Sequence, residues 1–196
     1  MDSSYITSAV NPQGYPEHNF PEFAFVGKSN CGKSSLLNSL LQRKNLAKHS
    51  STPGRTQMIN FFLVKVSQDD SFVLADLPGY GYSKTSKSIK ANWDKMLDSY
   101  LTSRKLSCVL FLFDIRRKIE DYEIEYMKSF HEKGTEILIV LTKTDKVKAN
   151  ELRKKKQEIL QNLAKYNIEK DKVIPCSTIK KVGIEDLRKK LFTSLS

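Results

Sequence analysis

The feature of this sequence that most restricts its fold is an alternation of short apolar segments with longer amphipathic ones. Short apolar runs suit strands buried on both faces, and apolar residues spaced three or four apart suit helices that cover a sheet. We therefore expect an α/β fold, a mostly parallel sheet between two helical layers. The predicted strands are Glu22–Val26, Ile59–Val66, Ser71–Ala75, Ser107–Phe113, Glu136–Leu141 and Lys172–Cys176, and the predicted helices are Lys33–Leu41, Lys90–Ser103, Glu120–Lys133, Lys148–Lys165 and Ile184–Leu195.

One pair of apolar segments departs from this alternation. Ile59–Val66 and Ser71–Ala75 are separated by a short polar turn, which indicates a hairpin and hence one antiparallel edge strand in a six-stranded sheet. The polar stretch Lys44–Gln57 resembles a loop where a crossover helix would be expected. We expect residues 1–21, which include the proline-containing stretch Pro12–Pro21, to be a lead-in to a single domain of residues 22–196.

Composition excludes several classes of protein. With 196 residues, 39% hydrophobic and 28% charged, the chain fits one globular domain rather than a disordered or collagen-like one. Its longest apolar runs are far shorter than the roughly 20 residues of a membrane-spanning helix, and the first ten residues lack the features of a secretory signal or a transit peptide. We expect a cytoplasmic protein that does not enter a membrane.

The three cysteines, Cys31, Cys108 and Cys176, are odd in number and far apart. They predict reduced thiols rather than a disulfide framework or a zinc cluster.

Positive charge is concentrated toward the C-terminus. From Lys143 onward the chain has 15 Lys or Arg residues against 7 Asp or Glu residues, which accounts for +8 of the net +11. Such an excess favours a polyanionic partner such as nucleic acid. On composition alone, a merely solvated helix face explains it equally well.

A phosphate-binding loop follows the first predicted strand. The segment Gly27-Lys28-Ser29-Asn30-Cys31-Gly32-Lys33-Ser34 matches GxxxxGK[ST] and precedes a predicted helix. In this pattern backbone N–H groups surround phosphate oxygens at a helix N-terminus. We expect Lys33 to contact the β- and γ-phosphates and the Ser34 hydroxyl to bind Mg²⁺. Cys31 is either an activated thiol at this terminus or, more often, a small filler.

Three further segments also follow predicted strands, where ligands bind in open α/β sheets. Asp76-Leu77-Pro78-Gly79 supplies a carboxylate for a metal-bound water and, at Gly79, an N–H for the γ-phosphate. Thr142-Lys143-Thr144-Asp145 places a carboxylate where guanine N1–H and its amino group can donate, with the Lys143 stem over the purine. Cys176-Ser177-Thr178 offers a backbone N–H to guanine O6. Taken alone, the first and the third segments are better explained as ordinary turns, and the second equally well as a helix cap. Together the segments indicate a GTPase.

The ordered set resembles GTPases of the translation-factor-related class. That resemblance implies that Thr56, after Pro53-Gly54-Arg55, completes the Mg²⁺ shell when GTP is bound, with Thr52 as the rival candidate. It also implies nucleotide contacts for Gly54, Arg55, Gln57 and Met58.

The sequence also resembles one particular family within this class. The stretches TSAV, GKSNCGKSSLLN, TPGRTQMINFF, DLPGYGYSK, DIRR and LTKTDK, with Trp93, are similar to the EngB family of GTPases. The resemblance implies a role in late assembly of the large ribosomal subunit in bacteria, with a link to cell division and septation. Assembly intermediates, with their rRNA and ribosomal proteins, would then be the partners of a monomeric protein.

Two other classes stay open. An ATP-dependent P-loop kinase would want an arginine-rich lid, and the TKTD segment argues against it. A constitutive nucleotide- and RNA-binding module with negligible turnover draws support from Tyr80, because Ras-like GTPases carry a water-orienting glutamine there. In a GTPase, catalysis would rest on Lys33, Thr56, Gly79 and Asn30. Asn30 matches the P-loop asparagine of K⁺-using GTPases, and a cap for the loop amides explains it equally well.

Switching is expected in two loops, Lys48–Gln57 and Pro78–Lys90, because Thr56 and Gly79 can hold them only while a γ-phosphate is present. The second loop offers possible partner contacts at Tyr80, Tyr82, Lys84, Lys87 and Lys90. Cationic contacts to rRNA phosphates are expected from Arg153–Lys156, Lys180, Lys181 and Arg188–Lys190, through backbone and shape rather than base reading.

Overall fold

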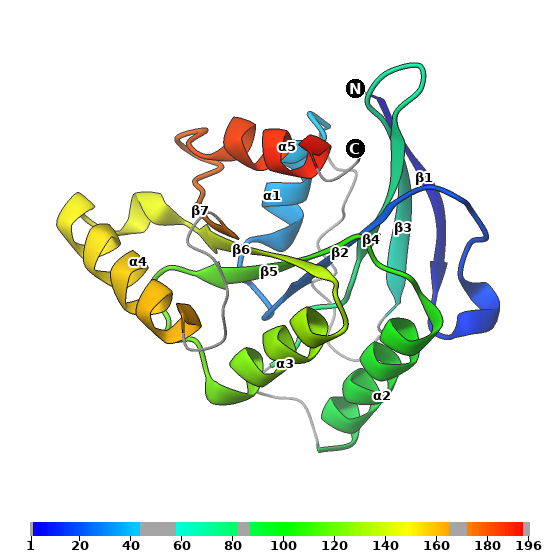
Figure 1. Cartoon of the computed structure of the whole chain (residues 1–196), viewed down its shortest axis with the longest axis horizontal. Coiled ribbons are helices and arrows are strands. Elements are labelled where there is room, and N and C mark those ends of the chain that lie inside the picture. The colour runs from blue at the N-terminus through cyan, green and yellow to red at the C-terminus, as the bar shows by residue number, and fades with distance from the viewer. Residues whose placement is uncertain (1, 44–57, 82–86, 165–171, 194–196) are drawn as a thin grey trace.

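A mixed β-sheet runs through the centre of the molecule, with helices on both faces (Figure 1). The computed structural model describes residues 2–43, 58–81, 87–164 and 172–193, and of residues 87–94 only the backbone. The strands are β1 (Asp2–Ala9), β2 (Glu22–Gly27), β3 (Ile59–Lys65), β4 (Ser71–Asp76), β5 (Cys108–Asp114), β6 (Glu136–Thr142) and β7 (Val173–Pro175). The helices are α1 (Lys33–Leu40), α2 (Lys87–Ser103), α3 (Asp121–Glu132), α4 (Ala149–Ala164) and α5 (Ile184–Thr193), with short 3₁₀ turns at Pro12–Gly14 and Thr144–Lys146.

The strand order is β1-β3-β4-β2-β5-β6-β7, so the sheet of the described residues has seven strands rather than the predicted six. The strand that the sequence did not predict is β1, which pairs with β3 along its whole length instead of forming part of a loose lead-in. Half of its residues are exposed and only two are buried, which is why it lacks the apolar signal of a buried strand. β3 is antiparallel to both neighbours and therefore lies inside the sheet, not at its edge.

Two hydrophobic layers hold the helices against the sheet. α1 and α5 pack on one face, over Phe23 and Phe25 of β2. α2, α3 and α4 pack on the other, over Ala24 and Val26. β5 is buried along its full length, as expected for a central parallel strand. Among the helices that the structure describes, none is long and apolar enough to cross a membrane.

A buried carboxylate fixes the start of β2. Glu22 is almost fully buried and accepts hydrogen bonds from Tyr100 of α2 and from Arg104, whose Nε lies 2.9 Å from Oε2. His18 Nε2 lies 2.9 Å from the same oxygen. Burial and the neighbouring carboxylate raise the pKa of the Tyr100 hydroxyl well above its usual value. This cluster anchors the strand at the end opposite to its predicted phosphate loop.

Arg188, predicted to lie on a basic surface, is instead buried in α5. Its guanidinium donates to Ser39 O at 2.8 Å and Leu40 O at 2.9 Å, and it forms an ion pair with Glu185. These carbonyls belong to the last turn of α1, where helical partners are lacking. Arg188 therefore joins α5 to the end of the helix that follows the predicted phosphate loop.

We expect Arg188→Met to lower the free energy of unfolding by about 2–4 kcal/mol, because it leaves buried carbonyls without charged donors. Lys189→Met is the matched control, since Lys189 is exposed one residue further on. Urea denaturation of both variants measures the difference, and equal midpoints would contradict the structural role of Arg188.

Candidate nucleotide site

The turn between β2 and α1 presents the beginning of a helix without a cap. Asn30 and Gly32 have φ of 62° and 100°, in the left-handed region that Gly32 adopts without strain. Gly32 is the N-cap of α1 and makes no side-chain capping hydrogen bond. The first N–H groups of α1 are therefore available to an anion, which the helix dipole also favours.

The Asp76–Gly79 segment lies directly against this turn. Ser29 N donates to Tyr80 O at 2.8 Å, and Tyr80 N donates to Gly27 O at 3.3 Å. A Cβ on Gly79 would lie 2.9 Å from Ser29 Cα, so only glycine allows this contact. Two predicted phosphate-binding segments, 50 residues apart in sequence, are thus in backbone contact.

Lys33 and Asp76 form an ion pair in the middle of the site. Their side chains are only 11% and 8% exposed, so each neutralises a largely desolvated charge of the other. Ser34 follows Lys33 in the first turn of α1.

These residues fit a magnesium-bound nucleoside triphosphate. Within the described part of the chain, no three His, Cys, Asp or Glu side chains come together as a metal cage. Mg²⁺ is usually held by one or two protein groups together with substrate phosphates and waters. A hydroxyl at Ser34, a carboxylate at Asp76 and an uncapped helix N-terminus provide that set of ligands.

The segment after β6 is tied to the phosphate loop. Thr142 Oγ1 donates to Cys31 O and also to Phe113 O at 3.2 Å. Lys143, in the left-handed region with φ 57°, donates from Nζ to Asn30 O. Its stem passes the turn, since its Cε lies 3.6 Å from the place of a Cβ on Gly32. The predicted base-reading and phosphate-binding segments therefore meet.

Asp114 is a site residue that was not predicted from the sequence. It ends β5 and forms an ion pair with Lys143, with Nζ and Oδ2 3.0 Å apart. Burial alone would raise the pKa of this carboxyl, but hydrogen bonds from Arg116 and Lys143 hold it well below its usual value. The available signal was its position, because Asp114 follows an apolar strand as Asp76 does.

Residues 176–178, the last predicted segment, orient the Asp145 carboxylate as a hydrogen-bond acceptor. Ser177 Oγ donates to Asp145 Oδ1 at 2.7 Å and is the main cause of the lowered pKa of that carboxyl. Thr144 N donates to Cys176 O at 3.2 Å, which joins the two segments through the backbone as well. Thr178 is half-buried beside them.

The cysteines are buried and unpaired, as predicted. Burial raises the pKa of Cys31 despite its neighbour Lys33, which makes it a filler rather than an activated thiol. Its Sγ lies 2.6 Å from the place of a Cβ on Gly27, so the two residues pack closely. Burial also raises the pKa of Cys176, to about 12.

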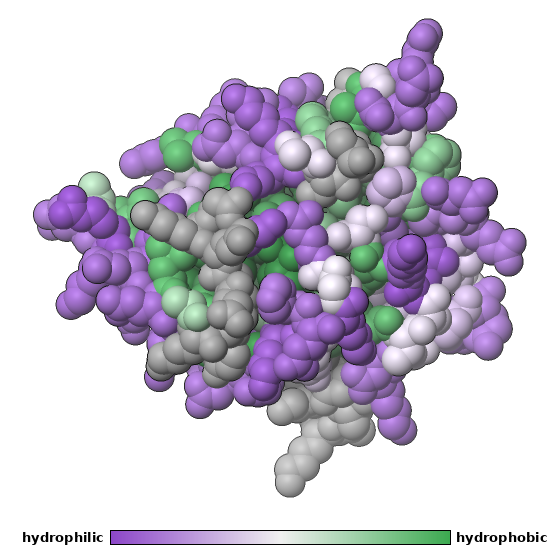
Figure 2. Space-filling model, in the orientation of Figure 1, coloured by the Kyte–Doolittle hydropathy of each residue, from purple (hydrophilic) through white to green (hydrophobic). Residues whose placement is uncertain are grey.

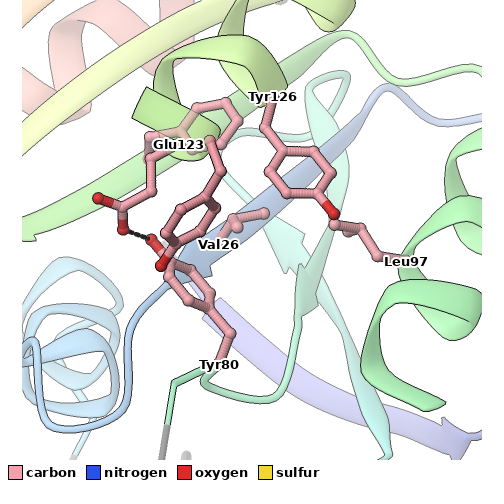
Figure 3. A pocket seen from close by; sticks show the side chains of 7 residues that line it. Val26, Tyr80, Leu97, Glu123 and Tyr126 are labelled. Carbon is pink, nitrogen blue, oxygen red and sulfur yellow. Dashed lines mark hydrogen bonds between the residues drawn. The ribbon is translucent and has the colours of Figure 1, made fainter. Parts of the chain in front are cut away.

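Tyr80 is not the exposed partner contact that the sequence suggested. Its side chain is 9% exposed, and its hydroxyl donates to Glu123 of α3 (Figure 3). Burial, followed by the nearby carboxylate, raises the pKa of Tyr80 well above its usual value. The ring lies in a small apolar pocket with Val26, Leu97 and Tyr126.

Several predicted residues lie outside the described part of the chain or apart from the site. Met58 is 44% exposed and directly precedes β3. Those outside are Thr52, Gly54, Arg55, Thr56, Gln57, Tyr82 and Lys84, together with the side chains of Lys87 and Lys90.

Comparison with known proteins identifies the family. Residues 22–143 match the family described as 50S ribosome-binding GTPase, and residues 95–196 match the elongation factor Tu GTP-binding domain. The chain is 46% identical to the probable GTP-binding protein EngB of Clostridium beijerinckii, over 97% of this chain and 93% of that protein. This chain belongs to the EngB family of GTP-binding proteins. Its relative in Caldanaerobacter subterraneus is 42% identical over 94% of this chain and 92% of that protein.

Solved structures support the same fold. A probable GTP-binding protein engB superposes with a TM-score of 0.69 at 18% identity, covering 89% of this chain and 98% of that one. Era, solved in complex with MgGDPNP and part of 16S ribosomal RNA, superposes with a TM-score of 0.70 at 24% identity, covering 91% of this chain and 58% of Era. The EngB-family chain is thus a P-loop GTPase in fold and activity, which excludes the kinase alternative.

We expect Asp145→Asn to weaken GTP binding by about 2–5 kcal/mol, because an acceptor for guanine N–H groups is replaced in part by a donor. The variant should gain affinity for xanthosine nucleotides, whose base offers an oxygen at that place. Titration with fluorescent GDP and XDP measures both. Asp121→Asn, an exposed change at the start of α3, is the control. Unchanged GDP affinity in Asp145→Asn would show that this carboxylate does not read the base.

Proposed function

We propose that this EngB-family GTPase is a slow molecular switch in late assembly of the large ribosomal subunit, acting as a monomer in the cytoplasm. The observation that carries the proposal is the match of residues 22–143 to the 50S ribosome-binding GTPase family. The resemblance to EngB proteins extends the proposal to cell division and septation. We further propose that residues 22–196, together with β1, act as one GTPase domain.

The nucleotide chemistry of the proposal follows from residues already in contact. Bound Mg²⁺ would neutralise charge on the β- and γ-phosphates, and Ser34, Asp76 and, by resemblance, Thr56 are the residues that would hold it. Lys33 would leave its ion pair with Asp76 and bind phosphate oxygens, while the N–H groups of α1 would bind the remaining phosphate oxygens. Gly79 would supply the N–H that senses the γ-phosphate, and Gly54 and Arg55 would flank it. Residues 142–145 and 176–178 would hold guanine.

Electrostatics support a nucleic-acid partner. Arg153 and Lys154 of α4 and Lys180 and Lys181 before α5 are exposed. The predicted basic surface is smaller than the sequence suggested, because Arg188 is buried and Lys155 donates to Ile115 O at 2.8 Å. The exposed cations would attract rRNA phosphates without reading sequence.

Slow intrinsic hydrolysis is part of the proposal. Tyr80 occupies the place of the water-orienting glutamine of Ras-like GTPases, and its hydroxyl is committed to Glu123. Its phenol is therefore not available to orient an attacking water. Stabilisation of charge by Lys33, Mg²⁺ and backbone N–H groups would remain, and a partner would accelerate the reaction.

We expect K⁺ to accelerate turnover relative to Na⁺, because Asn30 stands where K⁺-using GTPases carry a P-loop asparagine. The Asn30 backbone already approaches Lys143, and its side chain is exposed at the mouth of the loop. Phosphate release is compared in the two salts at equal ionic strength, with Asn30→Asp as the test variant and Asn38→Asp, within α1, as control. Identical rates in the two salts would remove K⁺ from the mechanism.

The proposed role is tested by sedimentation with ribosomal subunits. With a non-hydrolysable GTP analogue, the protein should co-sediment with large-subunit assembly intermediates several-fold more than with GDP, since only the switch loops distinguish the nucleotides. Small subunits serve as the control. Co-sedimentation that is equal with both nucleotides would favour the constitutive RNA-binding module instead.

A further inference from the structure

A cavity of about 280 Å³ lies between α4 and the connection from β5 to α3, and one of its lining residues, Arg116, donates to Asp114 at the edge of the nucleotide site. In Figure 1 this connection passes beside α4 on the helical face formed by α2, α3 and α4. Lys155 Nζ bonds to Ile115 O across the same junction. We call this cavity the α3–α4 groove. Its volume is just below the roughly 300–1,000 Å³ typical of sites for drug-sized ligands, so it suits one small planar group.

The floor of the groove is apolar. Ile119, Ile159 and Leu163 line it, and only Leu163 is fully buried. Figure 2 shows hydrophilic residues over the outer surface of α4 and hydrophobic residues between this helix and the centre of the view. An apolar floor of this size can accept the flat face of an unpaired base.

The rim of the groove is cationic. Arg116 and Lys118 line the groove on the β5–α3 side and are exposed, and Lys154, which is exposed on α4, is one helical turn from the lining residue Glu158. Arg117 also lines the groove, and its Nη1 is buried without a hydrogen-bond partner among the described residues. Arg117 therefore adds positive charge beneath the rim, although its Nη1 is not exposed to a ligand in the groove.

Two polar side chains of α4 also line the groove. Glu158 and Asn162 both line the groove and are one turn apart on α4, so they share a helix face. A carboxylate accepts hydrogen bonds from an exocyclic amino group, and an amide both donates to and accepts from a base edge. The Glu158 carboxylate would also repel a ligand that is rich in carboxylates.

We propose that the α3–α4 groove binds an unpaired base of single-stranded RNA, with its phosphates on the cationic rim. The apolar floor receives the base, and Glu158 selects bases that carry an amino group. Lys118 attracts the backbone, together with Arg116, whose guanidinium is also paired with Asp114. This inference builds on the proposed function, since it names how the protein contacts RNA. It also adds base reading where the sequence indicated backbone contacts alone.

The groove is connected to the nucleotide site through Arg117. The Nη2 of Arg117 lies 2.7 and 2.8 Å from the two carboxylate oxygens of Glu123, the residue that accepts from Tyr80. Tyr80 in turn bonds through its backbone to Gly27 and Ser29. Arg117 is therefore three contacts from the phosphate loop.

The test uses fluorescein-labelled RNA hexanucleotides and fluorescence anisotropy at fixed salt. The parent protein should bind hexa-adenylate and hexa-cytidylate more tightly than hexa-uridylate, and should bind an abasic hexamer at least tenfold more weakly than hexa-adenylate. Glu158→Gln should reduce the preference over uridylate, and Ile159→Ala should bring the normal and abasic ligands close together in affinity. GDP binding should be unchanged in both variants, which shows that they fold.

Two control variants separate base binding from charge. Gln161→Ala changes an exposed residue of α4 that does not line the groove and should alter nothing. Lys154→Gln should weaken normal and abasic hexamers equally and reduce the salt dependence. Equal affinity of the parent for normal and abasic hexamers would overturn the proposal. So would a loss of polyglutamate binding in Ile159→Ala with RNA binding intact, which would assign the groove to an acidic protein segment.

The outcome is separable from the proposed role in ribosome assembly. Hexanucleotide binding that survives while nucleotide-dependent co-sedimentation is absent would leave the groove proposal standing and refute the switch. Co-sedimentation that is normal in Ile159→Ala, with no difference between normal and abasic hexamers in the parent, would refute the groove proposal alone.

Discussion

The ion pair between Lys33 and Asp76 is the contact on which the nucleotide site depends. It joins the first turn of α1 to the end of β4, two elements whose side chains also share one hydrophobic cluster. Neither charge could remain in so little water without the other. In the proposed complex Lys33 would pair with phosphate oxygens and Asp76 with the metal, so ligand binding would replace one ion pair by two compensated contacts. The nucleotide would thus meet a site whose charges are already positioned.

A second layer of contacts sets where the base-reading segments lie. Lys143 is held between Asn30 O and Asp114, and Asp145 is held by Ser177. Both are hydrogen bonds or ion pairs between the ends of different parallel strands. Because the strands β5, β6 and β7 are in register, a residue at the end of one strand reaches the end of the next. The sheet therefore determines the geometry of the loops that follow it.

Much of this arrangement could be predicted from the sequence. The strand-ending positions of Gly27, Asp76, Thr142 and Cys176 placed four segments at one edge of the sheet, and the structure brings them into contact. β1 could not be predicted, because an exposed edge strand does not need apolar side chains. Arg188 and Tyr80 were misjudged for a related reason. Side-chain type suggests exposure, whereas burial depends on partners such as Leu40 O and Glu123, which lie far away in sequence.

The pairing of β1 with β3 would give the N-terminal strand a part in the proposed nucleotide response. β3 begins at Ile59, three residues after Thr56 in the sequence, and Ala9 lies opposite Ile59 in the register. β1 thus holds the start of β3 in place. If residues 48–57 form the proposed switch loop, a tag, extension or cleavage at the start of the chain would act on the strand that secures the end of this loop. Fusions intended to preserve nucleotide turnover would therefore belong at the other end of the chain.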